Sequence, residues 1–479
     1  MTIDYLLRRN LATGDARPLA MARRSLDAMA DGGLRDQLGG GFHRYSTDAR
    51  WLVPHFEQML YDNALLARVY LHAWAVTGDE RHRAVATGTL DYIARELTTD
   101  DGAFAASQDA DTEGIEGLTF TWRATEIREV LGDETGLFSA AYGVTEEGNW
   151  EGVTILSRVA SDEVLAERHG LPVGEVAAHL ASARALLLAR RGGRPQPARD
   201  DKALAAWNGL AIAAFADAAV ALLRVDAVAA ARYRAAAERA ASTIVNGLLA
   251  PNGSLMRSWK DGRAVGSGVL EDYTHMADGL LALYEATFDE RWFTVARALV
   301  DRVLAHFVDP TGGFFDTSDE HERLVTRPKD VQDNAVPSGN AMAAGVLLRL
   351  HAWTGEGAYR AAAERMIRIV VPLVDRYPTA FGQWLSAMDL ALRPVVEMAI
   401  VGEPGKAATE ALVAEVRRGF RPGQVVALAA NSAGSAIPLL HGRIAIESRP
   451  TAYICHSFVC RLPVTSPEAL RAELDALPT

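Results

Sequence analysis

Apolar residues recur with helical spacing along most of the chain, and the helical runs come in pairs. Residues 63–76 and 80–97 form one such pair, separated by Thr77-Gly78-Asp79. Three further pairs follow: 204–223 with 228–248, 280–289 with 292–307, and 341–353 with 359–374. A glycine or aspartate after the last apolar residue, together with a short connection, is typical of antiparallel helix pairs. The pattern therefore predicts a repeated helical hairpin.

Within each pair the first run is more apolar all round than the second. Residues 205–222 carry a single charge, Asp217, whereas residues 360–368 are rich in arginine and glutamate. A helix that is apolar on every side is buried, and an amphipathic helix faces solvent on one side. About six inner–outer pairs, from 5–11 with 18–30 to a last inner helix near 380–392, predict an all-α (α/α)6 toroid of the six-hairpin glycosidase-like type.

Four glycine turns punctuate this pattern, each between an outer run and the next inner run. They are Gly40-Gly41-Phe42, Gly102-Ala103-Phe104, Gly253-Ser254-Leu255 and Gly312-Gly313-Phe314. Self-similarity at a period of tens of residues is the signature of a repeated supersecondary unit. We expect these turns to return the chain to the inner ring and to place the polar clusters beside them on one face.

Two segments depart from the helical rhythm. Residues of about 99–200 hold short elements and an arginine-rich linker, which predicts an irregular insertion within a toroid that spans 1–393. Residues 394–479 predict a small α/β region. Its expected strands are 395–401, 425–429 and 452–455, and its expected helices are 407–418 and 467–477.

Composition and charge exclude some classes of function for this protein. The 479 residues carry a net charge of −12 without a long basic run, which argues against a nucleic-acid partner. No stretch approaches the roughly 18–20 uncharged apolar residues of a membrane span, and no secretory signal is evident, so we expect no membrane partner and a cytoplasmic protein. The two cysteines, Cys455 and Cys460, predict buried thiols in a reducing compartment.

No cofactor or metal is expected from the motifs. Dinucleotide fingerprints, Walker loops and nucleophile elbows do not occur in the chain. The acidic run that begins at Asp109 lacks the alternating oxygen ligands of a calcium loop.

Polar residues cluster where inner helices begin, which predicts a pocket lined by carboxylates, histidines and tryptophans. Such a pocket suits a saccharide, because aromatic rings cover apolar sugar faces while carboxylates bind hydroxyls. The candidate catalytic residues are His55, His275, Asp62, Asp109, Asp272 and Asp330. The candidate substrate-binding residues are His43, Arg44, Glu57, Asp111, Asp201, Trp207, Asn208, Tyr273, Arg327 and Lys329. The alternative is that these residues cap helices and order the turns.

Several long motifs resemble the YyaL / spermatogenesis-associated protein 20 family of thioredoxin-domain-containing proteins. They include residues 36–45, 51–63, 148–152, 201–209 and 327–340. The resemblance implies an (α/α)6 region similar to six-hairpin glycosidases and N-acylglucosamine 2-epimerases, preceded in family members by a thioredoxin-like domain that this chain lacks. Cys455 and Cys460 also fit the family's C-terminal pattern.

Two hypotheses follow for the toroid. The first is that it binds or transforms a carbohydrate-like small molecule. Epimerisation or isomerisation would use His55 and His275 as the proton-transfer pair, and hydrolysis would draw its acid and base from Asp62, Asp109, Asp272 or Asp330. The second is a non-catalytic binding or interaction module that in longer relatives serves the thioredoxin-like redox domain.

Overall fold

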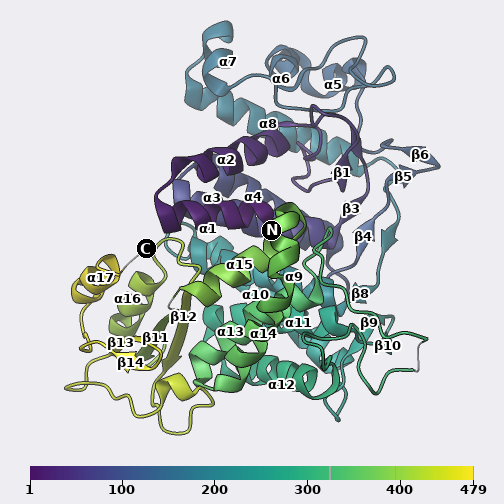
Figure 1. Ribbon diagram of the computed structural model, residues 1–479. Coiled ribbons are helices and arrows are strands. Elements are labelled where there is room, and N and C mark those ends of the chain that lie inside the picture. The colour runs from purple at the N-terminus through teal and green to yellow at the C-terminus, as the bar shows by residue number, and fades with distance from the viewer. Residues whose placement is uncertain (323–324, 394, 478–479) are drawn as a thin grey trace.

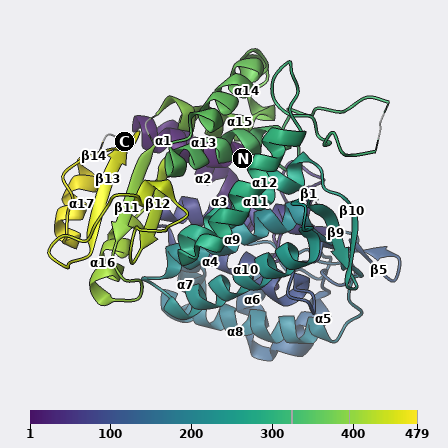
Figure 2. The ribbon, with the colours of Figure 1, turned by 90° about the horizontal axis from the view of Figure 1, so that it is seen from below.

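The computed structural model describes residues 1–322, 325–393 and 395–477. In this part of the chain six helices pack side by side in a closed ring, because α1 contacts both α3 and α15 (Figures 1 and 2). In ring order they are α1 (Thr2–Thr13), α3 (Leu60–Thr77), α9 (Ala205–Leu222), α11 (Leu270–Thr287), α13 (Gly339–Thr354) and α15 (Gly382–Leu392). The predicted (α/α)6 toroid is confirmed.

Outer helices cover this ring, each packed on the inner helix that precedes it in the chain. Within the described ranges they are α2 (Ala16–Asp31), α4 (Glu80–Tyr92), α10 (Ala227–Leu248), α12 (Glu290–His306) and α14 (Gly357–Arg376). Short helical pieces extend or join these elements: η1 (Ile93–Leu97), η2 (Gly132–Glu134), η3 (Pro378–Ala380) and η4 (Pro438–Leu440).

The link between an inner helix and its outer helix has a common construction. After α3, Gly78 takes a left-handed φ of 69°, and the Asp79 carboxylate then accepts the backbone N–H of Arg81 at the start of α4. Gly14 and Gly355 end α1 and α13 in the same conformation. The glycine ends one helix without a steric penalty and the aspartate caps the next, so the chain reverses within two residues.

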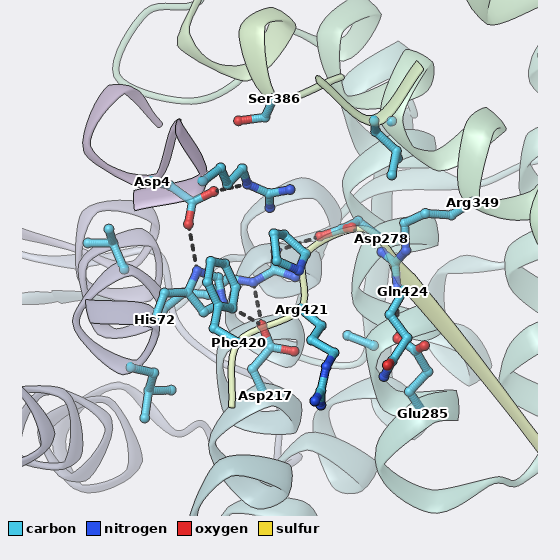
Figure 3. A pocket seen from close by; sticks show the side chains of 18 of the residues that line it. Asp4, His72, Asp217, Asp278, Glu285, Arg349, Ser386, Phe420, Arg421 and Gln424 are labelled. Atoms are coloured by element: carbon cyan, nitrogen blue, oxygen red, sulfur yellow. Dashed lines mark hydrogen bonds and ion pairs between the residues drawn. The ribbon is translucent and has the colours of Figure 1, made fainter. Parts of the chain in front are cut away.

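Helix α9 is the most deeply buried part of the ring. It is long and apolar enough to cross a membrane by length and composition, contrary to the sequence expectation, but 78% of this window is buried inside the protein. Its single charge, Asp217, points into the interior of the toroid (Figure 3). The apolar character of α9 therefore reflects contact with protein on all sides.

Three of the four glycine turns are fastened to the next inner helix by an asparagine. The Asn63 side chain accepts the N–H of Phe42 at 2.7 Å and donates to its carbonyl at 3.0 Å. The same two bonds recur twice: Asn208 with Phe104, and Asn340 with Phe314. Each turn thus has its buried backbone groups paired, which fixes the loop that leads toward the pocket face.

Short strands precede the inner helices on that face. They form the sheets β1-β2, β3-β4-β7, β10-β9-β8 and β5-β6. Their bounds are β1 (Tyr45–Ser46), β2 (Pro54–His55), β3 (Gln58–Met59), β4 (Ser107–Gln108), β5 (Asp111–Thr112), β6 (Ile115–Glu116), β7 (Arg199–Asp200), β8 (Ala203–Leu204), β9 (Met256–Lys260) and β10 (Arg263–Ser267).

The segment predicted as an irregular insertion holds four helices joined by loops and short strands. Its helices are α5 (Ala124–Leu131), α6 (Thr135–Tyr142), α7 (Asp162–His169) and α8 (Val173–Gly192). They enclose a separate apolar core around Trp122, Phe138 and Tyr142 and gather at one end of the molecule (Figure 1). The arginines of α8 obscured its apolar stripe in the sequence.

The C-terminal elements form a four-stranded sheet in the order β12-β11-β13-β14, flanked by α16 and α17 (Figures 1 and 2). They are β11 (Val396–Val401), α16 (Ala407–Val416), β12 (Gln424–Ala429), β13 (Thr451–His456), β14 (Val459–Cys460) and α17 (Pro467–Asp475). The predicted strands and helices are confirmed, whereas residue 394, at the predicted boundary, lies outside the described residues.

The prediction of two buried free thiols is wrong. Cys455 and Cys460 are joined in a disulfide across the β13–β14 hairpin, where they occupy directly opposed positions. Cys455 is buried and Cys460 is exposed.

Candidate functional site

A cavity of 540 Å³ opens beside the N-terminal end of α3, and we call it the entry pocket. Residues of the segment 43–51, which includes β1, and of the first two turns of α3 supply most of its wall. Its lining includes Leu34, His43, Arg44, Tyr45, Ser46, Asp48, Trp51, Asp62, Leu65 and Leu66. Three of the predicted site residues, His43, Arg44 and Asp62, therefore share one cavity.

Asp62 is the most unusual group in the entry pocket. Its Oδ2 atom is buried and has no hydrogen-bond partner in the protein. Burial, reinforced by the negative charge of Glu57, raises the pKa of Asp62 to about 8, although Arg44 acts in the opposite direction. A carboxyl group that keeps its proton at neutral pH is able to donate it to a ligand.

The pKa of His43 is shifted in the opposite direction. Burial lowers the pKa of its imidazole to about 4, so the ring is neutral at physiological pH. Its Nδ1 lies 2.8 Å from the Phe56 carbonyl and must donate there, which leaves Nε2 as the acceptor of the neutral ring. Asp62 and His43 thus form a protonated acid and a neutral base in one cavity. Environments that push two pKa values apart in this way identify candidate acid and base partners.

A series of side-chain contacts links Arg44, Glu57, His55 and Glu116. Arg44 forms an ion pair with Glu57 at 2.8 Å, and the Glu57 carboxylate lies 3.6 Å from His55 Nε2. The other ring nitrogen of His55 contacts Glu116 at 2.7 Å. The Tyr45 ring stacks on His55 at a centroid distance of 5.1 Å, which holds the imidazole at the rim of the pocket.

Trp51 lines the same pocket in a strained backbone conformation. Its φ of 61° lies in the left-handed region that bulky residues rarely adopt. The Asp48 carboxylate fixes the segment by accepting the N–H groups of Arg50, Leu52 and Val53. Strain that the surroundings enforce in this way is characteristic of functional sites.

Other predicted site residues serve the fold. The Asn208 amide bonds only the backbone of Phe104 and Leu204, and the Tyr273 hydroxyl accepts the N–H of Leu255 at 2.8 Å. The Asp272 carboxylate accepts the N–H groups of Ala206 and Val269. These three side chains tie the start of α9 and α11 to neighbouring segments, so the structure gives them helix-end roles and does not place them in the entry pocket.

His275, predicted as half of the proton-transfer pair with His55, is fully buried in α11. Its Nε2 lies 3.1 Å from the Pro337 carbonyl, and burial lowers its pKa. The ring therefore packs between inner helices, whereas His55 belongs to the series of side-chain contacts at the pocket rim. The structure does not bring the two imidazoles into one described cavity.

In the loop before α13, the charged side chains contact groups of the same loop and of the segment 309–317. Lys329 contacts Asp309 at 2.6 Å and the Gly312 carbonyl at 3.0 Å, and Arg327 bonds the Thr317 carbonyl. Asp330 caps its own loop by accepting the N–H of Gln332. These predicted residues order the fourth glycine turn.

The remaining predicted residues lie toward solvent or beside Tyr61. Asp109 and Asp111 are exposed, and Asp201 pairs with Arg199 at 2.6 Å. The Trp207 ring meets the Tyr61 ring edge to face at 4.8 Å. In the described residues, no group of three or more histidine, cysteine or acidic side chains is placed to hold a metal ion.

A second cavity, of 280 Å³, lies inside the ring, and we call it the lumen cavity (Figure 3). Inner helices line its sides, and residues 416–426 of the C-terminal region also line it. Its charged and polar lining includes Asp4, Arg8, Arg68, His72, Asp217, Asp278, Glu285, Arg349, Arg417, Arg421 and Gln424. Met1 and Leu65 border both cavities, so the two cavities are neighbours.

Two arginines of the lumen cavity, Arg68 and Arg349, neutralise carboxylates on neighbouring inner helices. Arg68 on α3 bonds Asp217 on α9 at 2.6 Å and Asp278 on α11 at 2.8 Å. Arg349 on α13 bonds Asp278 at 2.8 Å and Glu285 at 3.1 Å. Burial alone would raise the pKa of Asp278, but the two guanidinium groups outweigh it and hold the pKa below its usual value. The network links four inner helices.

A histidine extends this network toward α1. His72 contacts Asp4 at 2.6 Å and Asp217 at 3.6 Å. Burial opposes protonation of the ring, but the two carboxylates prevail and raise the pKa of His72. Sequence reasoning missed the lumen network, although Asp217, an isolated charge in an otherwise apolar inner helix, was the signal that could have revealed it.

Similar proteins were found by sequence. The chain is 34% identical to human spermatogenesis-associated protein 20 over 514 residues, which is 98% of this chain and 64% of the human protein. The mouse protein of the same name shows 34% identity with the same coverage. An uncharacterised protein of Caenorhabditis elegans is 27% identical over 94% of this chain. The chain thus spans less than two thirds of the length of these relatives, and no protein-family model matches it.

Solved structures with a related arrangement include sugar-active proteins. A D-mannose isomerase aligns with 75% of this chain and 87% of its own at 13% identity and a TM-score of 0.36. An unsaturated glucuronyl hydrolase from Bacillus sp. GL1 aligns with 73% of this chain and 84% of its own at 16% identity and a TM-score of 0.30. Because both TM-scores lie below 0.5, the fold assignment rests on the closed ring of inner helices described above.

Proposed function

We propose that the entry pocket binds a carbohydrate-like small molecule and transforms it by proton transfer, with Asp62 as the acid and His43 as the base. The observation that carries the proposal is the half-buried Asp62 carboxyl, whose Oδ2 is buried and unpartnered and whose pKa is raised to about 8. Leaving a buried polar atom unpaired costs about 1–3 kcal/mol, a cost that a ligand hydroxyl in the pocket would relieve.

The remainder of the pocket suits a polyhydroxylated ligand. The rings of Tyr45 and Trp51 offer apolar surfaces, and Arg44 offers a guanidinium already oriented by Glu57. The volume of 540 Å³ lies within the range of small-molecule sites. Two reaction types match this chemistry: isomerisation or epimerisation by proton transfer beside a carbonyl, and hydrolysis with Asp62 protonating a leaving oxygen.

The proposal is tested with a panel of mono- and oligosaccharides. We expect ligands that raise the melting temperature to undergo turnover as well. Nuclear magnetic resonance in D₂O separates the reaction types, because isomerisation or epimerisation incorporates solvent deuterium at carbon whereas hydrolysis produces new reducing ends.

Three variants show whether the pocket performs the reaction. Asp62→Asn and His43→Gln should each lower turnover by about 10²–10⁴-fold, the usual contribution of a positioned acid or base. Asp201→Asn is the matched control, because that carboxylate forms only a partly exposed ion pair. Saccharides that shift the melting temperature without any turnover would favour a binding module, and a panel without either response would contradict the proposal.

A further inference from the structure

The disulfide between Cys455 and Cys460 has a buried cation directed at both of its sulfur atoms. Arg443 is only 9% exposed, and its Nη2 lies 3.4 Å from Cys455 Sγ and 3.1 Å from Cys460 Sγ. Among the described residues Arg443 forms no ion pair with a carboxylate; its guanidinium also bonds the His441 carbonyl and lies over the Tyr453 ring, 5.9 Å from the ring centroid. A neutral disulfide compensates a buried guanidinium poorly, whereas a thiolate would form a full ion pair with it.

A buried carboxyl group lies in the same row of the sheet. Glu397 on β11 is directly opposite Cys455 on β13, which is directly opposite Cys460 on β14. Opposed residues on neighbouring strands point to the same face and lie within reach of each other. Glu397 is 3% exposed and accepts the Phe458 N–H at 2.7 Å. An acid and a cation therefore flank the sulfur pair.

The covalent link stabilises the fold less than a bridge across a long loop would. It closes a loop across a sequence separation of only five residues, and so short a loop restricts the unfolded chain weakly. The two residues of the hairpin turn, Ser457 and Phe458, have left-handed φ values of 49° and 64°, although neither is glycine. The chain thus holds a strained turn between the two sulfurs, and reduction of the disulfide would free it.

We propose that Cys455–Cys460 is a redox-active disulfide that exchanges electrons with dithiols. The thiolate of a dithiol reductant attacks the exposed Cys460 Sγ, the S–S bond breaks, and Cys455 leaves as a thiolate that Arg443 stabilises. The second thiolate of the reductant then attacks the mixed disulfide and expels Cys460, so the reductant departs as a cyclic disulfide. Two electrons pass to the protein, and the two protons of the dithiol pass to the cysteines or to solvent. Glu397 provides the nearby acid that exchanges a proton with buried Cys455.

The test measures the rate at which dithiothreitol reduces the folded full-length chain, with alkylation and mass spectrometry of the fragment that holds both cysteines. We expect reduction under native conditions without loss of circular dichroism. Arg443→Met should slow reduction by about 3- to 10-fold, because exchange is faster when the leaving thiol has a lower pKa. Arg443→Lys should retain most of the rate. Arg449→Met is the matched control, since that arginine pairs with Glu447 and does not contact the sulfurs.

A second measurement does not depend on a folded Arg443 variant. In the reduced wild-type chain, the alkylation rate of Cys460 is followed against pH, and the proposal predicts a midpoint below the ordinary thiol pKa of about 8.5. A disulfide that resists dithiothreitol until urea unfolds the chain, equal rates for wild type and Arg443→Met, or an alkylation midpoint at or above 8.5 would overturn the proposal.

Discussion

The entry pocket and the lumen cavity adjoin each other in the same ring of helices, yet Asp62 in the first and Asp217 and Asp278 in the second have opposite surroundings. In the lumen cavity, Asp217 and Asp278 each contact at least one arginine at 2.8 Å or less. In the entry pocket, Arg44 is engaged with Glu57, and Asp62 Oδ2 has no partner. Buried charges that are fully paired hold a fold together, whereas a buried group left unpaired is available to a ligand.

The presence or absence of an arginine partner also sets the protonation states of these carboxyl groups. Arginines hold the pKa of Asp217 and of Asp278 below the usual value, so both are ionised at neutral pH. Burial raises the pKa of Asp62 to about 8, because the nearby Arg44 is paired with Glu57. This carboxyl therefore keeps its proton. The comparison leads to four predictions, from the largest expected effect to the smallest.

Removal of the central cation of the lumen should have the largest effect. Arg68→Met leaves Asp217 and Asp278 without their shared partner, and we expect a loss of about 3–5 kcal/mol in the free energy of unfolding, measured by urea denaturation. Arg360→Met, which breaks an exposed pair with Glu364 on α14, should cost less than about 1 kcal/mol. Equal losses in the two variants would show that the lumen network is not structural.

Removal of an ionisable group from the entry pocket should raise the free energy of unfolding instead of lowering it. Because Asp62 has a folded-state pKa of about 8, above its unfolded value, the wild-type chain loses stability as the pH rises from about 4 to about 8. Asp62→Asn removes this loss, so at pH 9 we expect a gain of several kcal/mol in unfolding free energy and little change at pH 4. A variant less stable than wild type at pH 9 would refute the assignment of an unpaired carboxyl.

His72 tests the pH dependence of the lumen network. Its pKa is raised in the folded state, so its contribution is fully present below the unfolded pKa and is lost as the pH rises through the raised value. His72→Gln should therefore cost about 1 kcal/mol more at pH 5.5 than at pH 9. Thermal unfolding at both pH values measures this difference, and a cost independent of pH would argue against a protonated His72.

The smallest expected effect is a shift in the titration of Asp62. Glu57→Gln removes a charge that raises the pKa of Asp62 and frees Arg44 to stabilise the carboxylate, so that pKa should fall by about one unit. Carbon-13 magnetic resonance of the carboxyl group measures the change. Glu116→Gln serves as the control, because Glu116 contacts His55 and Phe56 rather than Asp62.

Much of the fold could be predicted from the sequence, because the ring depends on local patterns. Apolar faces, Thr-Gly-Asp connections and glycine turns each act within a few residues, and they identified the inner and outer helices. The helices inside the insertion were missed because the arginines of α8 hide its apolar side, and the disulfide because pairing of Cys455 with Cys460 depends on strand register.

The site could be predicted only in part. His43 and Arg44 directly follow one glycine turn and Asp62 lies in the first turn of the next inner helix, so the repeated pattern locates them together. Asn208, Tyr273 and Asp272 bond backbone groups and do not line the pocket. Which backbone groups lie opposite them depends on packing, so the sequence does not reveal it. The pairing of His43 with Asp62 likewise depends on burial, since both residue types are common at helix ends.

The protonation state of Asp62 tests the central claim most directly. A carbon-13 titration of the side-chain carboxyl groups, with Asp62→Asn used to assign the signal, reports the pKa in the folded chain. Our account predicts a group that remains protonated at pH 6 and titrates with a midpoint near 8. A carboxyl already ionised at pH 6, with a midpoint near 4, would contradict the role of Asp62 as the acid of the entry pocket.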